Sequence, residues 1–183
     1  MRRCVPCLIA LPALLAALVL PACGDDDSGT PAAETKERQS KTAEEPSPSA
    51  QREALKDTAV KPVIPKPTGS PPRKLVKEDI VKGKGPAAKK GDTLTVDYVG
   101  VAFSTGQEFD ASWDRGEPFD VVLGGRPPVI KGWEKGLVGI RKGGRRMLTI
   151  PPELAYGTQG YPPAIAPNET LIFVIDAVAV KPG

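Results

Sequence analysis

The chain has 183 residues, contains no histidine and carries a formal net charge of +3 at pH 7. This length favours about one domain, and the missing histidine excludes histidine-based general-base catalysis and histidine-ligated metal sites. The nearly balanced charge gives no indication of nucleic-acid binding, whereas 21 prolines and 19 glycines indicate a turn-rich β protein, unstructured segments or both.

The first residues have the features of a secretion signal. Arg2 and Arg3 precede an apolar run of about 15 residues, whereas a transmembrane helix needs about 20. The run ends in Leu20-Pro21-Ala22-Cys23-Gly24, which resembles the cleavage box of bacterial lipoproteins. The resemblance implies a signal peptide at residues 1–22, palmitate-type acylation at Cys23 and an anchor on the extracytoplasmic face of a bacterial cell membrane. An ordinary signal peptide that releases a soluble protein is the alternative.

All three cysteines lie in this region. Cys4 and Cys7 form a Cys-x-x-Cys pair, which could indicate a redox or zinc site, but no second pair exists in the chain. We therefore expect both to be removed with the signal peptide, so that the mature protein keeps only Cys23 and forms no internal disulfide.

Two linker segments follow the expected lipidation site. Residues 23–57 are rich in Ser, Pro, Ala, Glu, Lys and Gln and have few large apolar side chains, which predicts a disordered tether. A transient helix at residues 52–60 is the alternative for the end of this segment. Residues 58–72 are dense in proline and are expected to be extended, with any strand confined to a sheet edge.

Alternating apolar residues begin at Leu75 and predict an α+β domain. Leu94, Val96 and Tyr98 alternate with polar neighbours as a half-buried strand requires. Only residues 129–140 have the apolar spacing of a helix. Several short strands with one amphipathic helix favour an antiparallel sheet wrapped over that helix. The predicted strands are 75–81, 93–103, 118–124, 145–151 and 170–180.

Aromatic residues stand near the ends of these predicted strands, in four blocks of sequence. The blocks are VDYVG (96–100), EFDASWDRGEPF (108–119), VIKGWEKGLVG (129–139) and LAYGTQGYPPAIAPNETLIFVI (154–175). In order, spacing and residue type they resemble the FKBP family, the macrolide-binding peptidyl-prolyl isomerases. The resemblance implies an α+β fold in which a five-stranded antiparallel half-barrel wraps over one short helix, and it assigns residues 73–183 to this domain.

The resemblance also implies the residues of the site. Catalytic roles fall to an aromatic set with one carboxylate: Tyr98, Phe109, Asp110, Trp133, Tyr156 and Phe173. Substrate contacts fall to Arg115, Phe119, Val129, Ile130, Tyr161 and Ile165. In the family the arginine supports the aspartate, the isoleucine N–H holds a substrate carbonyl and the tryptophan forms the pocket floor. Taken singly, each residue has a plainer explanation as sheet core, turn cap or buried tyrosine.

The implied activity is cis-trans isomerisation of X-Pro bonds by stabilisation of the twisted amide in an aromatic pocket, with no cofactor or metal. Its implied partners are proline-containing unfolded or exported polypeptides, with a macrolide as the inhibitor to test; we expect no nucleic acid and a monomer. The alternative is a catalytically weak proline-peptide-binding or chaperone lipoprotein of the same fold. The complete aromatic set favours the enzyme.

Two proline pairs depart from the family pattern. Pro127-Pro128 precedes Val129 and removes two backbone donors from the expected rim. Pro162-Pro163 stiffens the flap between the last two strands, where Tyr161 replaces the histidine of some members and Ala164 replaces a larger apolar residue. We expect this flap to leave the site open to an extended peptide, and a Tyr161 side chain folded against Trp133 would overturn that expectation.

Overall fold

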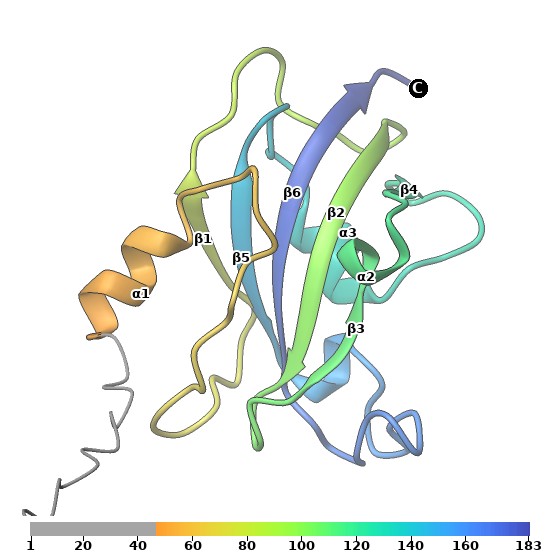
Figure 1. Ribbon diagram of the computed structural model, residues 1–183. Coiled ribbons are helices and arrows are strands. Elements are labelled where there is room, and N and C mark those ends of the chain that lie inside the picture. The colour runs from red at the N-terminus through yellow and green to blue at the C-terminus, as the bar shows by residue number, and fades with distance from the viewer. Residues whose placement is uncertain (1–46) are drawn as a thin grey trace, which may run out of the picture. The chain divides into compact units, whose positions relative to one another are not determined.

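The computed structural model describes residues 47–183 (Figure 1). The expected signal peptide, the lipidation site at Cys23 and the expected tether up to residue 46 lie outside the described residues. The structural findings therefore bear on the end of the expected tether, the proline-rich segment and the folded domain.

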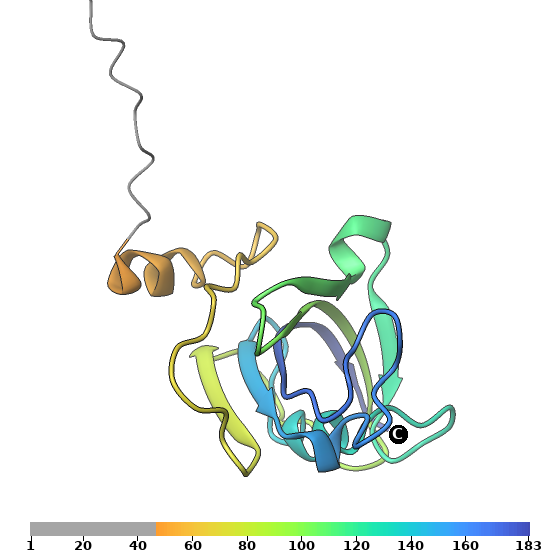
Figure 2. The same cartoon turned by 90° about the horizontal axis from the view of Figure 1, so that it is seen from below.

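One antiparallel sheet forms the body of the domain, in the order β1-β5-β6-β2-β3, and β4 also pairs with β2. The strands β2 and β6 are the longest, and they pair with each other along their length except for one bulge at Val178. Seen from below, the sheet is strongly curved (Figure 2). The strands are β1 (Val76–Val81), β2 (Thr93–Ala102), β3 (Glu108–Ala111), β4 (Phe119–Val122), β5 (Arg145–Ile150) and β6 (Leu171–Lys181).

The fifth position of the sheet is shared by two short strands. β3 pairs with the end of β2, and β4 pairs with its beginning. The short helix α2 (Ser112–Arg115) separates them. The six strands therefore occupy five positions, which agrees with the expected five-stranded half-barrel. β3 was not among the strands predicted from alternation, because its four residues are too few to establish a period.

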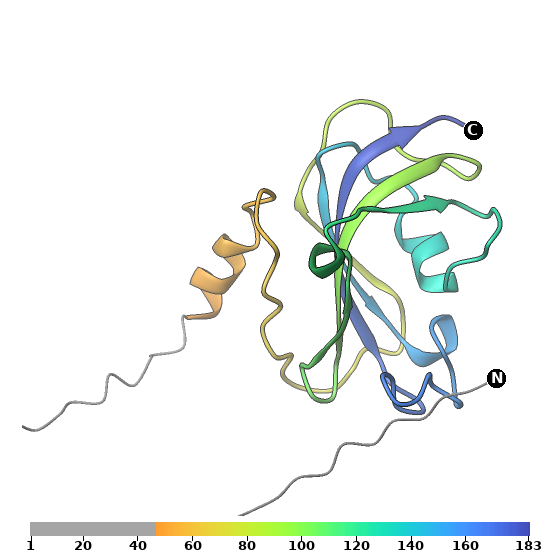
Figure 3. The ribbon, with the colours of Figure 1, turned by 45° about the vertical axis from the view of Figure 1, so that its right-hand side comes forward.

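The helix α3 (Lys131–Gly136) packs against the inner face of the sheet (Figure 3). Two glycines permit this close contact: a Cβ at Gly132 would lie 2.3 Å from the Ile150 side chain, and one at Gly136 would lie 2.6 Å from that of Leu148. The helix is shorter than the predicted range 129–140. It ends at Gly136, and three residues later Gly139 turns the chain away with a φ of +91°, a conformation that glycine adopts without strain.

The outer face of the sheet is covered by residues 47–72, here called the strap. The strap begins with helix α1 (Pro48–Ala54) and continues without helix or strand, as the prolines of residues 58–72 predict. Leu55 and Ile64 are 3% and 8% exposed and belong to an apolar cluster with Val99 and Val174. In Figures 1 and 3 the strap and α3 lie on opposite faces of the sheet.

The prediction of a disordered tether was wrong for residues 47–57. Ser47 caps α1 by accepting a hydrogen bond from the Ala50 N–H, and Pro48 occupies the first helical turn, where a missing N–H costs nothing. One buried apolar residue, Leu55, then fixes the segment to the sheet. Burying such a side chain contributes about 1.5–3 kcal/mol, which a composition average over a polar segment does not detect.

Candidate active site

Three aromatic rings from three elements form a buried floor on the inner face of the sheet. Tyr98 on β2, Trp133 on α3 and Phe173 on β6 are only 6%, 5% and 4% exposed. The Trp133 ring lies edge-to-face with both partners, with centroid distances of 5.1 Å to Tyr98 and 5.3 Å to Phe173. Such edge-to-face pairs add to the stabilisation from burial and fix the orientation of each ring.

Two further rings extend this floor toward solvent. Phe109 on β3 packs edge-to-face on Phe173 at 5.6 Å. Phe119, at the start of β4 and 40% exposed, lies 6.2 Å from Tyr98 and 6.4 Å from Trp133. The two halves of the broken fifth strand thus each contribute one partly exposed ring to the cluster.

Gly100 makes this arrangement fit, although sequence reasoning gave it no role. It stands opposite Phe173 in the β2–β6 pairing. A Cβ at this position would lie 2.7 Å from the Phe173 ring and 2.8 Å from the Phe109 ring, both closer than real contacts allow. Only glycine leaves room for the two rings to meet over the strand.

A hydrogen-bonded group of three side chains borders the rings. The Tyr98 hydroxyl donates to Asp110 Oδ2 at 2.5 Å, and Arg115 donates to Asp110 Oδ1 at 2.5 Å and to the Tyr98 hydroxyl at 2.8 Å. Burial and the hydrogen bond to Asp110 raise the pKa of Tyr98 to about 12. The pKa of Arg115 is also raised, chiefly by Asp110. The expected support of the aspartate by Arg115 is therefore present.

Ser112 is a second structural residue that sequence reasoning missed. Its fully buried hydroxyl accepts a hydrogen bond from the Tyr98 backbone N–H and donates one to Asp97, both at 2.9 Å. The bond to Tyr98 joins the start of α2 to the middle of β2. It therefore helps to fix the position of α2, from which the Arg115 side chain extends to Asp110. No sequence signal indicates this role, because β3, the strand that Ser112 follows, was not predicted and the bonded Tyr98 backbone is 14 residues away.

The entry to α3 presents an unused backbone donor. Val129 and Ile130 are half-buried and pack against the inner core, and Ile130 is the residue that caps α3. Its carbonyl accepts from Trp133 and Glu134. Among residues 47–183 its own N–H has no hydrogen-bond acceptor. Helix N-termini leave such donors free to bind an incoming oxygen.

The flap holds the remaining predicted residues. Ile165 is buried in the core, and its backbone exchanges hydrogen bonds of 2.8 and 2.9 Å with Tyr161. Tyr161 is 64% exposed and packs on Tyr156 at 5.7 Å, not on Trp133, as expected for an open flap. Burial, with a smaller effect of the Asp110 charge, raises the pKa of Tyr156.

All twelve predicted residues thus lie in or around one aromatic cluster, with Ile165 supporting it from the core and Tyr161 at its outer rim. The cluster offers an apolar floor, a partly exposed rim and one free N–H. Two surface grooves elsewhere on the described chain share no residue with it; both run past Pro71, Asn168 and Thr170. Within residues 47–183, no three cysteine, aspartate or glutamate side chains are grouped so as to bind a metal ion.

The family model and the similar proteins found by comparison all carry FKBP-type descriptions. A family model described as FKBP-type peptidyl-prolyl cis-trans isomerase matches residues 85–178. An FK506-binding protein of Streptomyces anulatus is 55% identical over 121 residues, which are 66% of this chain and 97% of that protein. The isomerase FkpA of Escherichia coli strain K12 is 49% identical over 109 residues, which are 60% of this chain and 38% of FkpA.

Solved structures agree with this comparison. The crystal structure of FkpA from Escherichia coli superimposes with a TM-score of 0.54 and 40% identity, over 73% of this chain and 59% of that one. The crystal structure of AtFKBP13 gives a TM-score of 0.52 and 40% identity, over 57% of this chain and 91% of that one.

Proposed function

The chain belongs to the FKBP family of peptidyl-prolyl cis-trans isomerases, and we propose that it acts on unfolded, newly exported polypeptides while anchored to a membrane through a lipid on Cys23. Its activity is the isomerisation of X-Pro peptide bonds. The aromatic cluster carries the proposal for where this reaction occurs, because it joins a dry floor, a partly exposed rim and a free backbone donor.

The reaction is a rotation about a bond and requires little covalent chemistry from the protein. The barrier to rotation about a peptide bond is about 18–20 kcal/mol, because resonance holds the amide planar. Twisting the bond removes that resonance and lowers the charge on the carbonyl oxygen. An environment of low polarity therefore lowers the energy of the twisted amide relative to the planar one. In the site, fixed dipoles replace the water that stabilises the planar form.

In this proposal the prolyl ring lies on the Trp133 indole, between Tyr98 and Phe173, with Phe109 closing the rim. The rings exclude water from the amide as it twists. The free N–H of Ile130 donates to a carbonyl of the bound peptide and so orients it. The Tyr156 hydroxyl, on the flap, is a second donor toward the peptide.

The group of Tyr98, Asp110 and Arg115 has an organising role in this mechanism. Each of the three side chains is hydrogen-bonded to the other two, so the Tyr98 side chain cannot swing about its Cα–Cβ bond without breaking two bonds. Asp110 and Arg115 are about half exposed, so the pair itself adds little to stability. We propose that it fixes the wall of the site and takes no proton during the reaction.

The anchor and the location rest on the sequence. The lipoprotein-type segment ending at Cys23 supports lipidation at the extracytoplasmic face of a bacterial cell membrane. Every helix within residues 47–183 is too short or too polar to cross a bilayer. The proposed anchor is tested by labelling cells with palmitate: the wild-type protein should carry label and sediment with membranes, and Cys23→Ser should do neither. An unlabelled wild-type protein would contradict the anchor.

The site is tested by ligand binding seen through Trp133. The family binds proline-containing peptides and macrolides, and we propose that both occupy this cluster in a monomeric protein. The chain has two tryptophans, so Trp113→Phe leaves Trp133 as the sole indole. In that variant, a macrolide should shift the Trp133 emission and abolish peptide isomerisation at the same concentration. Inhibition without any change at Trp133 would place the site elsewhere.

A further inference from the structure

The strap supplies most of the partners of a buried charge. All five N–H groups of Arg145, a residue with no exposed surface, are used. Two donate to the Asp176 carboxylate at 2.5 and 2.7 Å. The other three donate to strap carbonyls at 2.9 to 3.1 Å, those of Leu55, Asp57 and Val60. If the strap left the sheet, this guanidinium would lose more than half of its partners, so the strap is part of the fold.

The next residue along the strap, Lys61, reaches the edge of the sheet that carries the active site. Its ammonium group lies 2.6 Å from Asp114 Oδ1 and 2.8 Å from Glu108 Oε1. These hydrogen bonds raise the pKa of Lys61, and the bond to Lys61 lowers that of Asp114. One cation from the strap thus joins strand β3 to helix α2.

The two carboxylates that Lys61 joins are sequence neighbours of residues in the site. Glu108 directly precedes Phe109, which is followed by Asp110, and Asp114 directly precedes Arg115. Ser112 ties the middle of this segment to β2, but the β3 end is weakly held at its outer side, because β3 has four residues, pairs only with β2 and has a register shift within that pairing. An edge strand of this kind needs support from outside the sheet if its side chains are to keep fixed positions.

We infer that Lys61 is a positioning residue for the isomerase site. The Arg145 interactions fix the strap on the outer face of the sheet, and Lys61 fixes the β3–α2 segment so that the Phe109 ring and the Asp110–Arg115 pair keep their places. This role rests on the proposed catalytic use of the aromatic cluster. The strap precedes residue 85, where the match to the family model begins, so this support is supplied by a segment outside the residues which that model matches.

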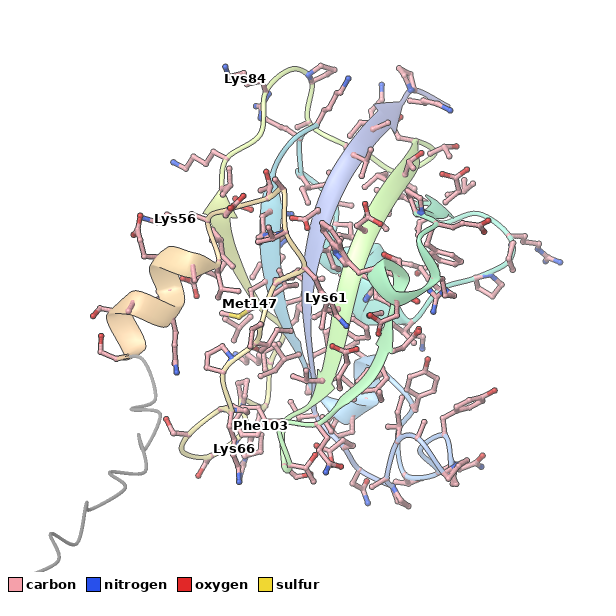
Figure 4. All side chains as sticks on the ribbon, in the orientation of Figure 1. Lys56, Lys61, Lys66, Lys84, Phe103 and Met147 are labelled. Atoms are coloured by element: carbon pink, nitrogen blue, oxygen red, sulfur yellow. The ribbon has the colours of Figure 1, made fainter. Side chains whose placement is uncertain are left out.

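The structure provides a matched control on the same strap. Figure 4 shows Lys61 in front of the middle of the sheet, whereas Lys66 lies near Phe103 at its lower end. Lys66 is exposed, and no ion pair of it is found within residues 47–183. Lys61→Met and Lys66→Met remove one charge each and keep most of the side-chain length. Lys61→Arg keeps the charge, and its guanidinium can bind both carboxylates.

The experiment compares these variants in the processed full chain carrying Cys23→Ser. We expect Lys61→Met to lower kcat/KM for an X-Pro peptide by about threefold to tenfold, because small displacements of positioning groups are costly to rate. Lys66→Met should match the parent chain, and Lys61→Arg should stay within about twofold of it. The gap between Lys61→Met and the parent should close in about 1 M salt, where exposed ion pairs are screened.

Amide hydrogen exchange of residues 108–116 supplies a readout that does not depend on turnover. It should become faster in Lys61→Met and stay unchanged in Lys66→Met. An unchanged kcat/KM in Lys61→Met overturns the inference, and so does unchanged exchange in this segment. If the parent chain itself shows no turnover, the proposed site fails, while exchange still decides whether Lys61 holds the segment.

Discussion

The hydroxyl of Tyr98 donates a 2.5 Å hydrogen bond to the carboxylate of Asp110. Arg115 donates to both groups, and its guanidinium carbon lies 5.6 Å from the centre of the Tyr98 ring. The hydroxyl of Tyr98 is therefore committed within the protein, and its ring is the part that faces Trp133 and Phe173. The polar group fixes the ring, and the ring forms the apolar surface on which the reaction depends.

This relationship predicts a loss of stability in alkali. The pKa of Tyr98 is about 12 in the folded protein, whereas an unfolded tyrosine has a pKa of about 10. The folded state therefore holds the proton more tightly, so its contribution is complete below about pH 10 and is lost as pH rises through about 12. Two pKa units correspond to at most about 2–3 kcal/mol, so urea unfolding should show a decline of this order across the window.

Tyr98→Phe separates this decline from other alkaline effects. The variant lacks the phenol, so its stability should fall less steeply between about pH 10 and about pH 12 than that of the wild type. Near neutral pH it should be less stable by about 1 kcal/mol, because Asp110 loses one hydrogen-bond donor. Identical slopes in the two proteins would show that Tyr98 does not hold its proton in the way described.

Gly100 should be needed for activity as well as for stability. In Gly100→Ala the new methyl group forces the Phe109 and Phe173 rings apart, at a cost of about 1–3 kcal/mol typical of overpacking. The displaced rings should lower kcat/KM by about tenfold or more. Gly91→Ala is the control, since its φ of +95° strains an alanine while open space surrounds it. Equal activity in the two variants would contradict the role of Gly100.

The docking of the strap is tested by two neighbouring residues. Ile64 is 8% exposed and packs on the outer face of the sheet, whereas Val63 is 83% exposed. Ile64→Ala should lower the free energy of unfolding by about 2–4 kcal/mol, and Val63→Ala should change it by less than about 0.5 kcal/mol. Denaturant titration measures both. A strap that hangs free in solution would make the two substitutions equally harmless.

Most of the fold could be predicted from the sequence, because alternation in β2 and the run of β-branched residues in β6 are strong local signals. The family pattern then brought together Tyr98, Trp133 and Phe173, which no local pattern could place side by side. The strap was missed because its docking depends on two isolated apolar residues, Leu55 and Ile64, within a polar and proline-rich context. Its principal partner, Arg145, lies about 90 residues away in the chain.

Within the site, the residues missed were those that act through space and backbone. Gly100 matters because it has no side chain. The need for this empty space depends on the contact between Phe109 and Phe173 above it, which the sequence does not show. Ser112 differs from the other serines of the chain through its hydrogen bond to the Tyr98 backbone, which is a tertiary contact. Neither residue carries the chemistry that a motif search looks for, so only the three-dimensional arrangement identifies them.

The most direct test compares two phenylalanines that are both partly buried but belong to clusters on opposite faces of the sheet. Phe109 is partly buried in the aromatic cluster, and Phe103 is partly buried in the outer cluster under the strap (Figure 4). Phe109→Ala and Phe103→Ala should cost similar stability, which thermal unfolding checks. In a proline-isomerisation assay on a short Leu-Pro peptide, Phe109→Ala should lower kcat/KM by about tenfold or more, and Phe103→Ala should leave it within about twofold of the wild type. Full activity in Phe109→Ala, or an equal loss in both variants, would contradict the assignment of the aromatic cluster as the site of isomerisation.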